Sequence, residues 1–250
     1  GIARNTDRLG KRYRIMWDQN TGHEGYYNPP LSPDRAAQSH HGFFEGRPVD
    51  AYVCSPGSNT GYTVDWPTKV PNAEFIVDRL TAGAKIGSVG LWRKAENTRR
   101  LWEQGIDPIG LQVEESRRLG IDHWFRLSMN DWHHQAGTWG EESSDVNLQA
   151  SKFYSNRPEL LIGEEGARGW PKSLANILRW LQDWNHEEVR ALRMGIAVEA
   201  MERYDADGFV YDFMRIPGYF KRGEEESGAE IMTGFIRQTR AAFDDIGKKK

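Results

Sequence analysis

Cysteine is almost absent from this sequence, since Cys54 is the one cysteine in 250 residues. A disulfide framework within the chain is therefore excluded, which agrees with a reducing compartment but does not require one. No apolar run approaches the roughly 20 residues that a transmembrane helix needs. The first residues, GIARNTDRLGKRYR, also lack the apolar stretch of a secretion signal. A membrane is not an expected partner.

Neither sign of charge dominates, because 33 lysines and arginines stand against 36 aspartates and glutamates, a formal net charge of -3. A protein that binds a nucleic-acid backbone needs a positive surface, so nucleic acid is not an expected partner either. The glycine-rich loop of dinucleotide-binding proteins is missing too. The first apolar run continues as DQNTGHEG, without the G-x-G-x-x-G spacing. We therefore expect no cofactor.

Aromatic residues, by contrast, are plentiful: there are 10 tryptophans, 9 tyrosines and 10 phenylalanines. Flat rings suit the apolar C–H faces of sugars, while the polar edges of tryptophan and tyrosine stay hydrated. Tryptophan also fills large hydrophobic cores, so the composition leaves both uses open.

Four short apolar runs, each bounded by polar or turn residues, have the length and composition of buried parallel strands. Because strands of this kind are covered on both faces, they carry apolar residues almost continuously rather than in alternation. The predicted strands cover residues 14–18, 50–55, 123–129 and 208–213.

Amphipathic helices are predicted between and after these runs. In the clearest one, Val189, Leu192 and Ile196 recur at helical spacing, and Asn185 with Glu188 resembles a capping box at its start. The predicted helices cover residues 73–82, 95–104, 108–119, 187–203 and 231–243.

The alternation of strands and helices indicates an α/β fold with parallel strands. The turns ESRRLGIDH and MERYDADGF, which precede the third and fourth strands, are typical helix-to-strand connections of a βαβ unit. Doubly wound sheets share this alternation, but the long polar loops after the strands favour a TIM-like (β/α) barrel. No internal repeat is visible, and the acidic run at 223–228 is interpreted as a solvated loop. Residues 1–250 are therefore expected to form a single barrel-type domain.

Side chains at the C-terminal ends of barrel strands converge on a common mouth, where barrel enzymes place their active sites. Polar residues follow each of the predicted strands. Those expected at the mouth are Asp18 after the first run, Asn130, Asp131, Trp132, His133 and His134 after the third, and Asp212 and Arg215 after the fourth.

Asp212 differs from the others because it lies inside an apolar run, where burying a carboxylate is costly without a purpose. An active-site role is the favoured interpretation, and a structural ion pair with Arg215 or Arg126 is the alternative. Asp205 and Asp207 stand at the opposite end of the same run and are interpreted as turn residues.

A divalent metal is a second possibility, since Asp131, His133, His134 and Asp212 carry side chains that can ligate one. These positions have neither His-x-His nor His-Glu-x-x-His spacing, and neighbouring residues point in different directions. Hydrogen bonds from the histidines to sugar hydroxyls are favoured instead, and no metal is expected.

The segment DWNHEEVRALRMGIAVEAMERYDADGFVYDFMRIP, residues 183–217, resembles the glycosyl-hydrolase-like 10 proteins. In these proteins a helix that begins near an hPevR motif leads into a strand of the form yDvDGihfDd..yP. FRLSMND at 125–131, LLIGEEG at 160–166 and the first-run RIMWDQNTG are similar to the related family 10 glycosylhydrolase proteins. The resemblance covers most of the chain, and residues 183–217 are its specific part.

This resemblance implies a TIM-like barrel that acts on glycosidic bonds, with Asp212, the second aspartate of the DGxxxD block, in the active centre. It also implies a periplasmic or extracellular location. A closed barrel needs eight strands, so residues 1–250 are expected to be its N-terminal portion, with four or five βα units and incomplete at the C-terminus. Self-association would cover the sheet edge that such a portion leaves open.

The sequence thus predicts a glycoside hydrolase that acts on a polysaccharide or oligosaccharide through a carboxylate pair. Asp212 is expected to be the nucleophile or base, and Asp131 its partner. Two alternatives remain: a carbohydrate-binding barrel without catalysis, and a metal-dependent hydrolase that uses the metal-ligating residues named above. The side chains expected to contact the sugar are Asp18, Arg126, Asn130, His133, His134, Tyr211 and Arg215, with Trp17, Trp66 and Trp132 as stacking surfaces.

Overall fold

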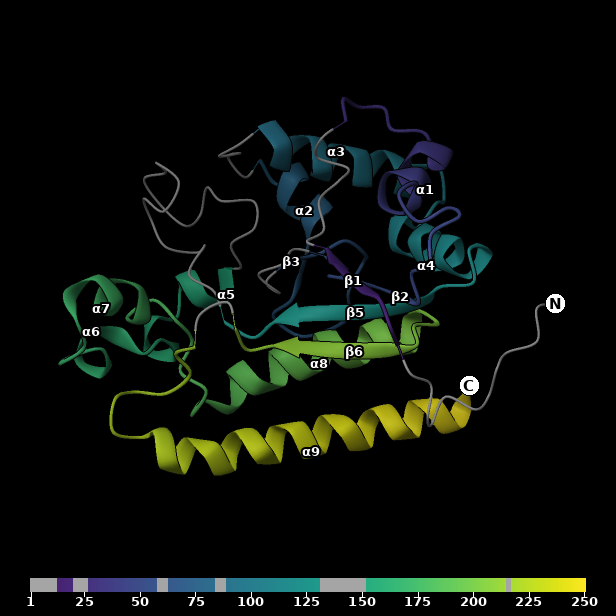
Figure 1. The fold of residues 1–250 in the computed structure, drawn as a ribbon. Helices are drawn as coiled ribbons and strands as arrows, with labels where there is room; N and C mark the ends of the chain where they lie inside the picture. The colour runs from purple at the N-terminus through teal and green to yellow at the C-terminus, as the bar shows by residue number, and fades with distance from the viewer. Residues whose placement is uncertain (1–12, 20–26, 58–62, 84–88, 131–151, 215–216) are drawn as a thin grey trace.

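The computed structural model in Figure 1 is a mixed α/β structure built on a parallel sheet. Helices of very different lengths surround this sheet, and the long C-terminal helix runs beside its last strand. The structure describes residues 13–19, 27–57, 63–83, 89–130, 152–214 and 217–250.

Four strands form the main sheet in the order β1-β2-β5-β6, and each pair of neighbours is parallel. Parallel neighbours require a crossover connection, which the helices supply. The predicted strands are confirmed, each with its ends shifted by no more than two residues. The prediction that all four are buried is wrong for the first, because residues 16–18 are exposed. Their bounds are β1 (Met16–Gln19), β2 (Ala51–Cys54), β5 (Asp122–Ser128) and β6 (Gly208–Asp212).

The helices agree less closely with the predictions. The helix at 187–203 has the predicted bounds, whereas the last helix extends beyond 231–243 at both ends. The first helix was not predicted, because its sequence PDRAAQSHH is short and contains few apolar residues. Its start is fixed instead by Ser32, whose side chain accepts a hydrogen bond from the backbone N–H of Arg35. The helices are α1 (Pro33–His41), α2 (Ile76–Thr81), α3 (Val89–Glu103), α4 (Pro108–Arg118), α5 (Lys152–Ser155), η3 (Pro158–Leu160), α6 (Gly163–Gly166), α7 (Lys172–Leu178), α8 (Glu187–Arg203) and α9 (Glu225–Lys249).

Two local predictions are wrong. Asn185 does not form a capping box, because α8 is preceded by His186 without a side-chain cap, and the Asn185 amide donates to Glu224 instead. The acidic run at 223–228 is not simply a loop, since Glu225 and Glu226 form the first turn of α9. Negative charge at that position is stabilised by the partial positive charge of the helix N-terminus.

One face of the sheet packs against helices and forms the main hydrophobic core. Side chains along a strand alternate between the two faces, so Tyr52, Phe125 and Leu127 share this helix-covered face and are buried. The helices contribute Ile109 and Val113 from α4, Val189, Leu192 and Ile196 from α8, and Phe235 from α9.

The opposite face carries charge, and we call it the charged face. The strand register places Asp18, Val53 and Trp124 on it in a row across β1, β2 and β5. Arg126 lies on the same face, two residues after Trp124, and so does Asp212, which pairs with Ser128 of β5. The site is therefore organised on the side of the sheet away from the main core.

Outside the main sheet, β3 (Thr63–Val64) and β4 (Glu74–Phe75) form a small parallel pair that was not predicted. Among the described residues the main sheet has four strands, so its closure into a barrel remains a proposal. Within the same residues, no helix combines the length and apolar character needed to cross a bilayer.

Gly208 marks the point where β6 passes under the ring of Trp124. A Cβ added at Gly208 would lie 2.5 Å from that ring, which is far inside van der Waals contact. We predict that Gly208→Ala lowers the free energy of unfolding by about 1–3 kcal/mol, measured by urea denaturation. Gly234→Ala in α9 is the matched control, because open space surrounds that position and the change should be stabilising or neutral. Equal effects at both positions would contradict this packing.

Candidate active site

Three charged side chains from three strands meet toward the C-terminal end of the sheet. Nη1 of Arg126 lies 3.0 Å from Oδ2 of Asp18 and donates a hydrogen bond to it. The same nitrogen lies 3.6 Å from Oδ2 of Asp212. We call these residues the Asp18–Arg126–Asp212 cluster. All three were predicted as site residues, and the strands β1, β5 and β6 bring them together.

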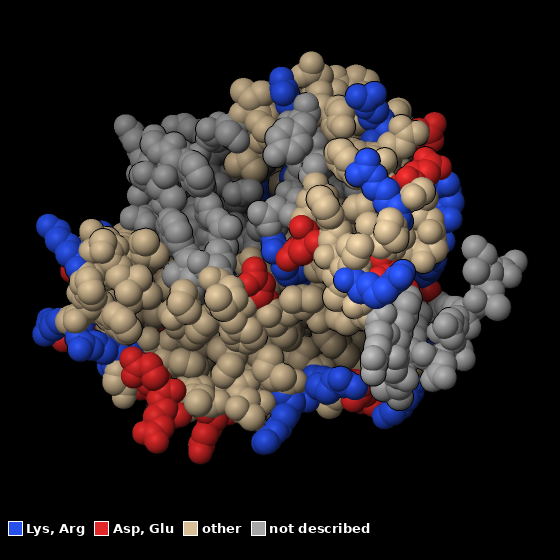
Figure 2. Space-filling view, viewed as in Figure 1, with Lys and Arg blue, Asp and Glu red and all other residues tan. Residues whose placement is uncertain are grey.

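The cluster is partly exposed. The side chain of Asp18 is 48% exposed, that of Asp212 20% and that of Arg126 12%. Figure 2 shows acidic and basic side chains side by side near the centre of the molecule in this view, close to the C-terminal ends of β1 and β5. The ion pair that offered a structural explanation for Asp212 is thus present, but it is accessible to solvent rather than sealed in the core.

Backbone groups fix the orientation of Asp212. Its Oδ1 accepts a hydrogen bond of 2.9 Å from the backbone N–H of Met214, which leaves Oδ2 directed toward Arg126. Its own carbonyl accepts from the backbone N–H of Met129 at the end of β5. The carboxylate is therefore held in one orientation by contacts that do not depend on a ligand.

Two neighbouring polar residues hold the surrounding loops. Asn130 is fully buried, and its amide donates to the carbonyl of Gly218 and accepts from the backbone N–H of Gln182. Tyr219 donates to the carbonyl of Phe213 over 2.7 Å. Burial, assisted by the negative charge of Asp212, raises the pKa of Tyr219 above its ordinary value, so its hydroxyl stays protonated. The Asn130 amide thus serves these loops rather than a sugar.

The charges of the cluster determine what it can do chemically. A carboxylate can act as a nucleophile or base, or accept hydrogen bonds from hydroxyl groups. Of the residues in the cluster, Arg126 offers the donors and the two aspartates offer the acceptors.

Three predicted sugar-contacting residues do not join the cluster. Trp66 is fully buried, donates to Glu199 and packs edge-on against Tyr204, so the prediction of a stacking role for it is wrong. Tyr211 faces the helices, where its ring meets Phe235, because it neighbours Asp212 on the strand and points to the other side. Trp17 is 48% exposed, but it also points to the helix-covered side of β1.

Several predicted residues lie outside the described part of the chain. Within the part that is described, no group of three or more metal-ligating side chains is close enough to hold an ion. That finding leaves the alternative metal site untested, because most of its residues are among those not described. The predicted site residues that lie outside the described part are Asp131, Trp132, His133, His134 and Arg215.

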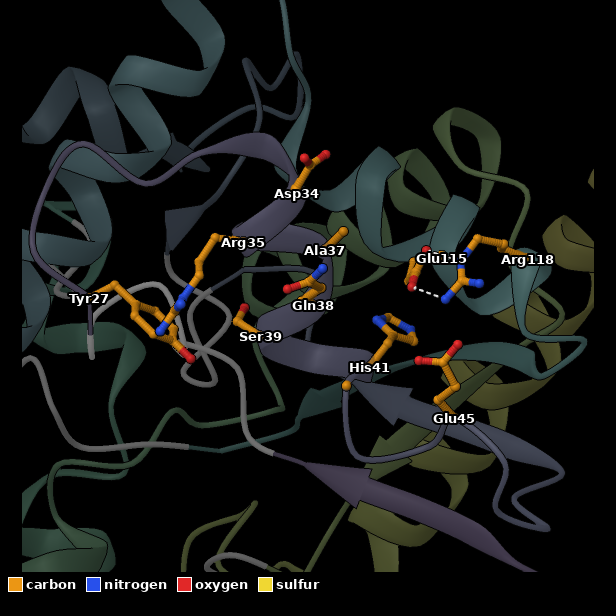
Figure 3. Close-up of a pocket in the computed structure, with 11 residues that line it drawn as sticks. Tyr27, Asp34, Arg35, Ala37, Gln38, Ser39, His41, Glu45, Glu115 and Arg118 are labelled. Atoms are coloured by element: carbon orange, nitrogen blue, oxygen red, sulfur yellow. Dashed lines mark hydrogen bonds and ion pairs between the residues drawn. The ribbon is translucent and has the colours of Figure 1, made fainter.

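A cavity of about 680 Å³ between α1 and α4 was missed from the sequence, because α1 was not predicted. Figure 3 shows charged and polar side chains around it, with His41 at its edge. Arg118 pairs with Glu115 by two hydrogen bonds of 2.7 and 2.8 Å, and this contact lowers the pKa of Glu115. The residues that line it are Tyr27, Asp34, Arg35, Ala37, Gln38, Ser39, His41, Gly42, Glu45, Glu115 and Arg118.

Behind His41 a chain of buried polar side chains crosses the core. Nε2 of His41 lies 2.6 Å from Oγ of Ser116, which lies 2.9 Å from Nδ1 of His123. Nε2 of His123 lies 3.4 Å from Sγ of Cys54. All four residues are at most 1% exposed. We interpret this series of contacts as structural: it gives the polar side chains buried between the sheet and α4 hydrogen-bond partners.

Comparisons with known proteins bear on the fold. No family model and no curated protein matches the sequence. Among solved structures, the alpha-L-fucosidase isoenzyme 2 from Paenibacillus thiaminolyticus has a similar fold, with a TM-score of 0.53 and 15% sequence identity. The match covers 94% of this chain and 31% of the fucosidase, so the chain spans about a third of that protein's length. At this identity the likeness is one of fold alone.

The burial of Trp66 leads to a prediction that separates a core role from a sugar-binding role. Trp66→Phe removes the hydrogen bond to Glu199 and leaves a gap in the core. It should lower the free energy of unfolding by about 2–4 kcal/mol, measured by urea denaturation. Trp92→Phe is the control, since Trp92 is 39% exposed on α3 and its replacement should change stability by about 0.5 kcal/mol or less. A Trp66→Phe variant as stable as the control would contradict the core role.

Proposed function

We propose that this chain is a glycoside hydrolase of the (β/α)-barrel type, with its sugar substrate bound over the Asp18–Arg126–Asp212 cluster. The observation that carries the proposal is a partly exposed pair of carboxylates at the C-terminal end of parallel strands. Enzymes of this fold bind their substrates at that end. The likeness in fold to a fucosidase supports a barrel that acts on sugars.

We assign Asp212 as the carboxylate that acts at the anomeric carbon. Its fixed orientation and its partial exposure suit a carboxylate that attacks the anomeric carbon or activates a water molecule beside it. In either case the bond from the anomeric carbon to the leaving oxygen breaks, and that oxygen takes a proton from a second acid.

The second acid is not Asp18 in this proposal. Asp18 already accepts a hydrogen bond of 3.0 Å from Arg126, so we assign it to substrate binding. Asp131 directly follows Asn130 at the end of β5 and stays our proposed proton donor. Asp18 and Arg126 then bind sugar hydroxyls, one as an acceptor and the other as a donor.

The test uses aryl glycosides, among them an α-L-fucoside, whose hydrolysis releases a coloured phenol. Asp212→Asn keeps the shape of the side chain and its bond from Met214 but removes the charge, so kcat should fall by about 10²–10⁴-fold. Asp245→Asn is the control, because Asp245 lies on the exposed surface of α9 beside Lys248 and its loss should leave kcat unchanged.

Other outcomes would replace the proposal with one of its alternatives. Glycan binding without turnover by the unaltered chain would indicate a non-catalytic carbohydrate-binding protein. Hydrolysis that EDTA abolishes and a divalent metal restores would indicate the metal-dependent hydrolase. An Asp212→Asn variant with unchanged kcat would remove Asp212 from the mechanism.

A further inference from the structure

The turn after β6 contains a peptide unit that is hydrogen-bonded at both of its ends. This unit joins Phe213 to Met214, and we call it the 213–214 peptide. Its N–H, from Met214, donates over 2.9 Å to Oδ1 of Asp212. Its carbonyl, from Phe213, accepts over 2.7 Å from the hydroxyl of Tyr219. Because a peptide unit is planar, its N–H and carbonyl rotate together, and a contact that holds one also holds the other.

The exposure of Met214 makes the bond from Tyr219 important. Met214 is 84% exposed, so packing of its side chain contributes little to the orientation of the 213–214 peptide. On the other side, the backbone N–H of Met129 holds the carbonyl of Asp212. That bond fixes the preceding peptide, but each residue has two soft backbone dihedral angles, so it does not fix the next one. The hydroxyl of Tyr219 supplies a contact that does.

Tyr219 is itself firmly placed. The carbonyl of the preceding Gly218 accepts from the buried amide of Asn130, and the carbonyl of Tyr219 accepts over 2.8 Å from the backbone N–H of Trp184. Its ring packs at an angle against the rings of Trp184 and Phe213, with centroid distances of 6.0 and 5.4 Å. Because burial raises the pKa of Tyr219, its hydroxyl keeps the proton that it donates.

We propose that Tyr219 is a positioning residue for Asp212 and acts through the 213–214 peptide. The inference rests on the proposed function, since it gives the orientation of the Asp212 carboxylate a part in hydrolysis. The Tyr219 hydroxyl orients the peptide, the peptide N–H orients Oδ1, and Oδ2 stays directed toward Arg126. Hydrogen bonds in series also polarise one another, so the first strengthens the second. In this role Tyr219 needs no contact with the sugar.

Hydrogen exchange at one backbone amide tests this connection without catalysis. Tyr219→Phe keeps the ring but loses the donor, so the Met214 amide should exchange about tenfold faster, measured by NMR. Tyr204→Phe is the matched control, because it also removes one tyrosine hydroxyl, which donates to Asp107. Tyr204 precedes β6, whereas Asp212 ends that strand, so Met214 exchange in the control should equal that of the unaltered chain.

Steady-state kinetics with the aryl glycosides test the consequence for catalysis. A misoriented carboxylate impairs the chemical step more than it impairs sugar binding. Tyr219→Phe should therefore lower kcat about tenfold and change KM by about twofold or less. Tyr204→Phe should leave both constants unchanged. A merely structural role for Tyr219 would not separate kcat from KM in this way.

Three results would overturn the proposal. The first is unchanged exchange at Met214 in Tyr219→Phe, and the second is an equal acceleration in both variants, which would indicate a general loss of stability. The third is an active Tyr219→Phe chain with unaltered kcat. A chain that hydrolyses no glycoside would instead remove the proposed function, and the exchange rates would still decide whether Tyr219 orients Asp212.

Discussion

The position of Arg126 is the constraint on which the candidate site depends. Its side chain is 12% exposed, and its guanidinium lies within ion-pair distance of two carboxylates from different strands. A charge in so sheltered a place is stable only with partners, and two aspartates close together repel each other without a cation. Asp18, Arg126 and Asp212 therefore stabilise one another as a unit, and the position of each is set by the register of its strand.

The sheet makes this unit possible by separating its two faces. Side chains that face α4, α8 and α9 form the core, and the residues between them can be charged without entering it. The same alternation explains why the side chains of Tyr211 and Asp212, which are adjacent in the sequence, point to opposite faces of the sheet. Stability thus comes from one face, and the chemistry is assigned to the other.

The main sheet was predictable because each strand is a compact apolar run between turn residues, and Asp212 was recognisable as a charge inside such a run. The same reasoning failed for Trp66, since composition does not distinguish a tryptophan that fills a core from one that lines a surface. It also failed at Asn185, whose amide finds a partner 39 residues away in Glu224, a contact that no local pattern contains. The pairing of Asp18 with Arg126 likewise spans 108 residues and requires the sheet order, which periodicity does not provide.

The most direct test of the account is the position of a bound oligosaccharide in a crystal structure of the Asp212→Asn chain. We expect sugar hydroxyls within hydrogen-bond distance of Asp18 and Arg126, and an anomeric carbon beside residue 212. A sugar bound instead in the cavity between α1 and α4, with the Asp18–Arg126–Asp212 cluster unoccupied, would contradict the central claim.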